Sequence, residues 1–186
     1  MTFLIVLTVL IVAIVGYGVT LYNRLVALSN ACENAWSDID VQLKRRYELI
    51  PNLVETVKGY AEHEKGTFTE VTNARSQAMQ ATGPEAKAAA EGNLTRVLKS
   101  LFAVAEAYPE LRANQNFLAL QEELSSLENA IQNARRYYNA VVRDLNTRCE
   151  AFPSNLVANN FGFEKKEYFE LDAPEERAAP SVSFGT

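Results

Sequence analysis

The chain has 186 residues, of which 48% are hydrophobic and 22% charged, as is typical of one folded domain with short appendages. Its formal net charge of −5 has the wrong sign for a protein that holds nucleic acid through phosphate contacts, so we expect no nucleic-acid partner. The two cysteines, Cys32 and Cys149, are too few for a disulfide framework and lack zinc-site spacing. We therefore expect no metal and no other cofactor.

Residues 2–23 contain no charged side chain and predict a transmembrane helix. Because an α-helix rises ~1.5 Å per residue, roughly 21 residues cross the ~30 Å hydrocarbon core of a bilayer. A cleaved signal peptide is disfavoured, because the segment lacks a basic start, a shorter apolar core and a small-residue cleavage site. We expect residues 1–23 to be a single-pass anchor in the lipid bilayer, with the following membrane-spanning residues: Phe3, Leu10, Gly16, Tyr17, Thr20 and Tyr22.

Three features near the end of this segment bear on how it sits in a membrane. Tyr17 and Tyr22 suit the headgroup level, where aromatic rings with a polar tip are common, although lipid-facing aromatics are an equal alternative. Gly16 and Thr20 form a small-xxx-small pair, a weak signal for helix association in lipid. Arg24 follows the segment and no basic side chain precedes it, which favours a translocated N-terminus and a cytoplasmic domain.

Residues 24–151 are predicted to form an all-α domain, an antiparallel up-down helical bundle. Apolar residues recur at steps of three or four in four stretches, separated near Gly66, at residues 81–84 and at residues 108–111. A packed helix tolerates an isolated glycine, so three helices are the alternative if the first continues past Gly66. We expect the first helix to reach residue 63, with part of its apolar stripe uncovered.

Residues 152–186 differ in composition, since they contain proline, asparagine and spaced aromatic residues. The pair Phe152 and Pro153 ends the last predicted helix. We expect an extended tail that lies along the bundle through its aromatic rings, with disorder beyond Pro174 as the alternative.

The stretch YELIPNLVET, residues 47–56, places Pro51 inside an otherwise helical pattern. Proline lacks an N–H and its ring opposes the carbonyl four residues back, so we expect a kink that leaves the Tyr47 carbonyl seeking a partner. In the simpler interpretation, the bend wraps the helix around its own bundle. In the functional one, it shapes a groove in which Asn52 and Glu55 meet another chain. A new helix starting at Pro51 is disfavoured, because the preceding residues are poor N-caps.

The search for a catalytic site finds no recognisable motif. The sequence contains no HExxH, GxSxG or phosphate-binding glycine loop, and its one histidine, His63, is expected to be solvated near a helix end. Asp38 and Asp40 are two residues apart and face different sides of a helix, which makes them a poor general acid/base pair. We expect no catalytic residues and no enzyme activity, with a site assembled across helices as the open alternative.

The cluster RRYYN, residues 135–139, is the most concentrated polar and aromatic group on the last helix. As a bundle feature, Arg135 would pair with acidic residues of the first helix, while Tyr138 packs and keeps its hydroxyl in water. Asn139 belongs to the same cluster, which is too small for a nucleic-acid patch on an acidic domain. Trp36 is expected to pack between helices rather than cover a binding site.

Three segments carry a family resemblance, and together they span most of the chain in order: residues 34–64, NAWSDIDVQLKRRYELIPNLVETVKGYAEHE; residues 108–146, YPELRANQNFLALQEELSSLENAIQNARRYYNAVVRDLN; and residues 152–163, FPSNLVANNFGF. The sequence resembles the LemA family. This resemblance implies a bacterial membrane protein with one N-terminal transmembrane helix, a short N-terminus outside and a helical bundle inside. It implies no established activity.

Three functions from different classes are compatible with these observations. The favoured one is a non-enzymatic single-pass protein whose bundle is a self-associating scaffold at the bacterial cytoplasmic membrane. The alternatives are an adaptor for another membrane protein, such as a membrane protease, and an unrecognised hydrolase. We expect a homo-oligomer, because the long first helix would leave apolar residues such as Leu28, Ala35 and Ile39 seeking cover.

Overall fold

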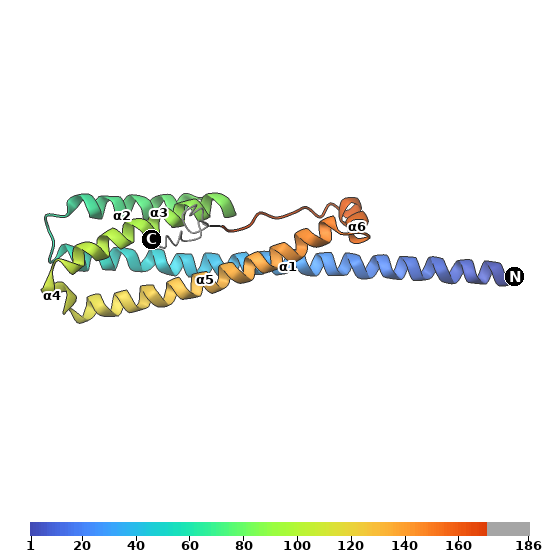
Figure 1. The fold of residues 1–186 in the computed structure, drawn as a ribbon, viewed down its shortest axis with the longest axis horizontal. Coiled ribbons are helices and arrows are strands. Elements are labelled where there is room, and N and C mark those ends of the chain that lie inside the picture. Colours follow the sequence, from blue (N-terminus) through green and yellow to red (C-terminus); the bar gives the residue numbers. More distant parts are fainter. Residues whose placement is uncertain (171–186) are drawn as a thin grey trace, which may run out of the picture. The chain divides into compact units, whose positions relative to one another are not determined.

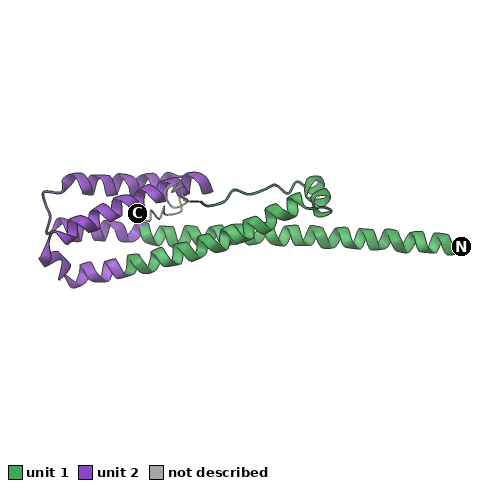
Figure 2. Ribbon diagram, viewed as in Figure 1, with its two compact units in different colours: residues 1–46, 123–168 green, residues 47–122, 169–186 purple. Residues whose placement is uncertain are grey.

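The computed structural model describes residues 1–170 of the chain, and in this part every regular element is an α-helix (Figure 1). The all-α prediction is therefore confirmed. The helices are α1 (Thr2–Lys58), α2 (Lys65–Gln80), α3 (Pro84–Glu106), α4 (Pro109–Arg112), α5 (Gln115–Glu150) and α6 (Ser154–Phe161). Residues 1–46 and 123–168 form one compact unit, unit 1, and residues 47–122 with Phe169 and Glu170 belong to a second, unit 2 (Figure 2).

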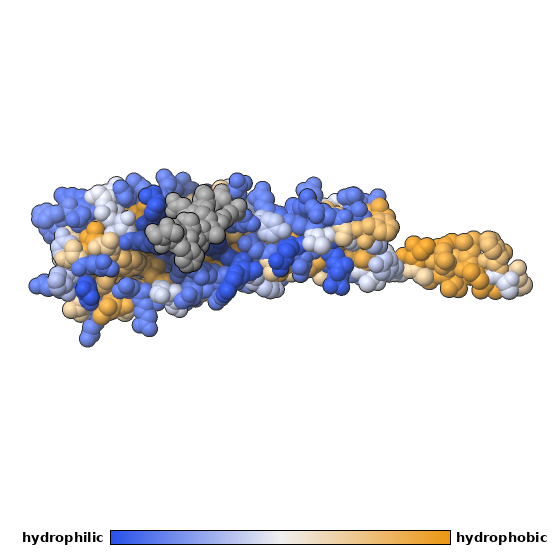
Figure 3. Space-filling model, viewed as in Figure 1, coloured by the Kyte–Doolittle hydropathy of each residue, from blue (hydrophilic) through white to orange (hydrophobic). Residues whose placement is uncertain are grey.

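Helix α1 continues without a break from the apolar segment into the bundle. Its residues 2–17 are exposed, and the surface of this segment is mostly hydrophobic (Figure 3). From Leu21 onward, one side chain is buried at every third, fourth or seventh position: Leu21, Leu25, Cys32, Ala35, Ile39 and Leu43. By length and composition, α1 is the one helix of the described chain that can cross a membrane.

In unit 1, α1 packs antiparallel to α5. Arg46 of α1 pairs with Glu128 of α5 at 3.2 Å, and the ring of Trp36 lies 5.4 Å from that of Tyr138. Partners nearer the N-terminus of α1 thus lie nearer the C-terminus of α5, as antiparallel helices require. The apolar face of α5 buries these side chains in the unit: Leu124, Leu127, Ile131, Val142 and Leu145.

Unit 2 contains the end of α1, the helices α2, α3 and α4, and the start of α5. Because α1 ends at Lys58, the four-helix arrangement is correct and the three-helix alternative is wrong. The break falls at residues 59–64 rather than at Gly66, which lies inside the first turn of α2. The next turn follows the prediction, since Gly83 adopts a φ of 82° and Pro84 begins α3.

The expected uncovered stripe on the first helix is not observed. Ala35 and Ile39 are fully buried within unit 1, and Leu28 is half-buried. The antiparallel α5 runs along this part of α1, so the chain itself supplies the cover that we had assigned to a second copy.

The C-terminal segment contains a helix that the sequence pattern did not predict. Helix α6 begins where the Ser154 hydroxyl donates to the carbonyls of Arg148 (2.7 Å) and Ala151 (2.9 Å), and it ends at Gly162, whose φ of 73° is left-handed. Residues 163–170 follow without regular structure, as expected of an extended tail. The predicted disorder beyond Pro174 falls outside the described residues.

Candidate functional site

The most buried polar cluster in unit 2 surrounds the inserted proline, and we call it the Pro51 node. It consists of Tyr47 and Pro51 on α1, Arg75 on α2, and Lys87 and Glu91 on α3. Tyr47, Lys87 and Glu91 are buried, the last with only 3% of its surface exposed. Three helices therefore contribute polar groups to one place in the interior of the unit.

The proline explains the first contact of this node. Pro51 has no N–H, so the carbonyl of Tyr47 lacks its usual helical donor. Arg75 supplies that donor from α2, with its Nε atom 2.7 Å from the Tyr47 oxygen. The prediction that this carbonyl needs a partner is thus answered by a neighbouring helix of the same chain.

The side chain of Tyr47 makes the second set of contacts. Its hydroxyl donates to the Oε1 atom of Glu91 and lies 3.3 Å from the carbonyl oxygen of Ala78. Lys87 donates to the same Ala78 carbonyl at 3.1 Å, and its Nζ atom lies 5.8 Å from the centre of the Tyr47 ring. One carbonyl in the last turn of α2, that of Ala78, is in this way bound by side chains of α1 and α3.

In unit 1, side chains of α5 hold the extended C-terminal segment, an arrangement that we call the tail clamp. The hydroxyl of Tyr138 donates to the carbonyl of Glu167 at 2.9 Å. Asn146 makes two bonds with Lys166: its Nδ2 donates to the Lys166 carbonyl, and its Oδ1 accepts from the Lys166 N–H, both at 2.9 Å. The Nζ atom of Lys166 in turn lies 3.3 Å from Oε1 of Glu33 on α1.

A third cluster lies at the end of the apolar segment of α1. The ring of Tyr22 is 4.9 Å from that of Phe161 and 5.7 Å from that of Phe163. Both rings of the C-terminal segment thus contact the end of the predicted membrane span. Sequence spacing offered no signal for this contact, because the partners are far apart in the chain.

The family assignment rests on the sequence model of the LemA family, which matches residues 35–184. The chain belongs to the LemA family. Magnetosome protein MamQ 2 of Paramagnetospirillum magneticum is 26% identical over 189 residues, covering 86% of this chain and 70% of the relative. Protein LemA of Metamycoplasma hominis is 26% identical over 157 residues, covering 82% of this chain and 70% of the relative. This LemA-family chain is thus a membrane-associated protein with an N-terminal hydrophobic helix.

The remaining sequence-predicted residues of this LemA-family chain do not gather into one site. Asp38 and Asp40 are exposed on α1, and Asn52 is exposed beyond the proline. Glu55 pairs with Lys58 at 2.7 Å and lines a surface hollow of about 460 Å³. Asn52 is not among the residues that line this hollow: Glu55, Lys58, Gly59, Glu62, Lys65 and Phe68.

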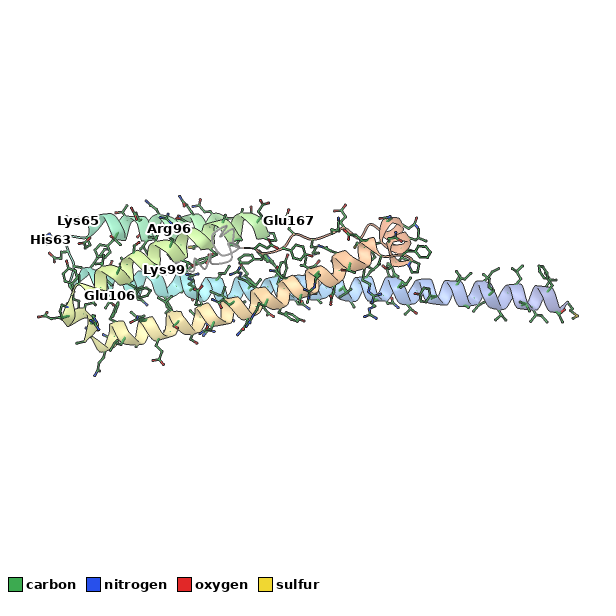
Figure 4. All side chains as sticks on the ribbon, in the orientation of Figure 1. His63, Lys65, Arg96, Lys99, Glu106 and Glu167 are labelled. Carbon is green, nitrogen blue, oxygen red and sulfur yellow. The ribbon has the colours of Figure 1, made fainter. Side chains whose placement is uncertain are left out.

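His63 lies in the exposed loop between α1 and α2, close to Lys65 (Figure 4). It does not line the neighbouring hollow, although Glu55 and Glu62 do. Within residues 1–170, no three side chains of histidine, cysteine, aspartate or glutamate are grouped as a metal site requires.

The predicted RRYYN cluster divides between two environments. Tyr138 is buried against Trp36, and its hydroxyl binds the tail instead of water. Arg135 and Asn139 are half-buried on α5. One ion pair between α1 and α5 has its cation, Arg46, on α1, and the pairing expected of Arg135 stays a prediction.

Burial also changes the acidity of three groups in unit 1. It raises the pKa of Tyr138 to about 12, with smaller contributions from Cys32 and Glu167. Burial likewise raises the pKa of the Cys32 thiol and that of the Cys149 thiol. Both cysteines are free, and a raised pKa makes each a poor nucleophile near neutral pH.

Proposed function

We propose that this protein is a non-enzymatic scaffold that α1 anchors in the bacterial cytoplasmic membrane and that self-associates through this anchor. The proposal rests on a difference in exposure between two parts of the chain. Buried polar groups in the Pro51 node bind other parts of the same unit, whereas the whole circumference of residues 2–17 is exposed. The polar side chains of the Pro51 node thus stabilise the bundle, and the anchor offers exposed surface for association.

The absence of enzyme activity is proposed from how the node is closed. A catalytic group has to touch its substrate, and the buried Tyr47, Lys87 and Glu91 leave no surface for one. Their polar atoms already bind Ala78 or each other. The arrangement favours a structural role over hydrolysis.

We assign self-association to the anchor because α5 already covers the apolar stripe of α1 in unit 1. A Cβ atom added at Gly16 would meet no atom within 4 Å, so a second helix has room to approach there. The Thr20 hydroxyl donates to the Gly16 carbonyl at 3.0 Å, so it brings no unpaired donor to such an interface. Small residues spaced by four favour close contact of helices in lipid.

The test uses the full chain in lipid vesicles and measures energy transfer between donor- and acceptor-labelled copies as the protein-to-lipid ratio falls. Gly16→Leu fills the open face and is expected to lower the associated fraction roughly tenfold, because packing of small residues drives this contact. Gly18→Leu is the matched control, since it adds the same side chain about 200° around the helix. A wild-type chain that stays monomeric, or equal effects of the two variants, would contradict self-association through this face.

The adaptor alternative makes a different prediction for the native membrane. If the protein serves another membrane protein, a pull-down from solubilised membranes will recover that protein in stoichiometric amount, and vesicles with the isolated chain will contain monomers. A scaffold of identical copies will instead recover mainly itself.

We also propose that the bundle lies on the cytoplasmic side, since Arg24 is the first basic residue after the span. A protease added to sealed cells should leave the bundle intact, and a membrane-impermeant thiol reagent should label Cys149 only after the membrane is opened. Digestion of the bundle from outside would show that the bundle lies on the opposite side of the membrane.

A further inference from the structure

Three apolar side chains in and just before α6 are largely exposed. Phe152 is 79% exposed, Leu156 53% and Phe161 65%. Ser154 and Ala158, one turn apart, form the buried face of the helix. Because two residues span about 200° of an α-helix, Leu156 points away from this buried pair, whereas Phe161 lies toward the side that contacts Tyr22 of α1.

The segment around α6 also lacks charge. Residues 152–163, FPSNLVANNFGF, contain no acidic or basic side chain in a chain that is 22% charged overall. In the space-filling view, hydrophobic surface lies at the position of α6 next to the anchor (Figure 3). A run of twelve uncharged residues with exposed apolar side chains is unusual on a surface that meets only water.

The position of α6 along α1 indicates what covers these side chains. A helical span that begins at Thr2 reaches ~30 Å near Tyr22, the thickness of the hydrocarbon core. The ring of Phe161 lies 4.9 Å from that of Tyr22, so it lies at the level where the span leaves the lipid. Burial of α1 begins at Leu21, inside the uncharged segment, so unit 1 covers the last turn of the anchor.

We propose that α6 is an interfacial membrane element, with Phe152, Leu156 and Phe161 in the boundary between headgroups and acyl chains. Aromatic and apolar side chains favour this boundary, and an interfacial helix buries its apolar face ~5–10 Å deep. The lipid surface covers these side chains in our proposal, because the contact of Phe161 with Tyr22 places α6 beside the end of the span. The protein would then contact the bilayer at two points, which restricts the rotation of α1 about its axis.

The experiment places an environment-sensitive nitrobenzoxadiazole dye at position 156 of the full chain. The variant is Leu156→Cys in a Cys149→Ser background, in which the remaining Cys32 is buried. Val41→Cys is the matched control, because Val41 is 52% exposed but lies on α1 about 28 Å beyond Tyr22. Both proteins are reconstituted in phosphatidylcholine–phosphatidylglycerol vesicles, with or without a doxyl label near the headgroup of the phosphatidylcholine.

The doxyl lipid is expected to lower the emission of the dye at position 156 by roughly twofold or more, and that at position 41 hardly at all, given the ~5–10 Å depth. This quenching should persist when the protein is diluted in lipid. Equal quenching at the two positions would overturn the proposal. The proposal would also be overturned if the dye at position 156 were shielded from water at a high protein-to-lipid ratio and lost this shielding on dilution. A second copy of the chain, and not the lipid, would then cover Leu156.

Discussion

The two units of this protein fix their helices in different ways. Unit 2 uses the Pro51 node, in which Tyr47 makes a buried hydrogen bond with Glu91 and a partly buried one joins Arg75 to the Tyr47 carbonyl. Unit 1 has a largely apolar seam between α1 and α5, crossed by the ion pair of Arg46 with Glu128. The bonds of its tail clamp are only partly buried, as where Asn146 holds the backbone of Lys166. A buried polar group that loses its partner cannot turn to water, so the loss of a buried bond of the Pro51 node should cost more than an equal loss in the tail clamp.

The comparison also shows what a proline inside a helix can contribute. In unit 1, α5 docks the tail with side chains, because its own carbonyls are used within the helix. In unit 2, Pro51 releases one carbonyl of α1, and that carbonyl becomes the acceptor for Arg75 of α2. The missing N–H thus creates a specific contact between two helices.

The largest effect is expected from Glu91→Ala, which removes the acceptor of the Tyr47 hydroxyl inside unit 2. The buried hydroxyl then keeps only the 3.3 Å contact with the Ala78 carbonyl, and the lost bond should lower the free energy of unfolding by about 2 kcal/mol. Glu91→Gln keeps a carbonyl acceptor and should recover part of the loss. Thermal unfolding of the full chain in detergent, followed by circular dichroism, measures the change. The exposed Glu106→Ala on the same helix is the control, and an equal loss there would contradict the difference between buried and surface groups.

The next effect comes from the freed carbonyl. Arg75→Ala should lower the free energy of unfolding by about 1–2 kcal/mol, because the Tyr47 carbonyl loses its donor. In a Pro51→Ala background, the new N–H at position 51 can bond that carbonyl within the helix. The cost of Arg75→Ala should then fall by about 1 kcal/mol, a coupling that a double-mutant cycle measures.

An identical cost of Arg75→Ala in both backgrounds would show that the arginine acts through packing alone. The Pro51 node would then keep its contacts, but the proline would have no part in docking α2.

The sequence predicted the elements better than their partners. The 3.6-residue pattern indicated α2, α3 and α5, and proline chemistry indicated that the Tyr47 carbonyl needs a donor. The sequence did not indicate that Arg75 is this donor, because Arg75 lies on another helix and three-dimensional packing decides which side chain reaches the carbonyl. The pattern also missed α6, since FPSNLVANNFGF is short and its apolar residues face outward as well as inward. Burial of Ile39 was missed for the same reason: one helix does not show how much of it a second will cover.

A smaller effect is expected from the tail clamp of unit 1. Asn146→Ala removes both bonds to the backbone of Lys166 and should lower the free energy of unfolding by about 1 kcal/mol, since water can replace part of them. Proteolysis of the segment after Phe163 should accelerate in the full chain. Asn129→Ala, at an exposed position of α5, is the matched control. An unchanged cleavage rate in Asn146→Ala would show that other contacts hold the segment.

The smallest effect at neutral pH concerns Tyr138, and it grows in alkali. Burial raises the pKa of its phenol from 10.0 to about 12 in the folded chain. Between these values the folded chain keeps a proton that the unfolded chain releases, so stability falls as pH rises from 10 to about 12 and is unaffected by this group below 10. Tyr138→Phe should cost about 1 kcal/mol at pH 7, because the bond to the Glu167 carbonyl is lost, and should flatten the alkaline decline. The neighbouring Tyr137→Phe, whose ring is exposed, is the control in melting curves at pH 8–11.5. If the stability of both variants falls with pH as steeply as that of the wild type, the fold does not raise the pKa of the Tyr138 hydroxyl. The tail clamp would then be weaker than its geometry indicates.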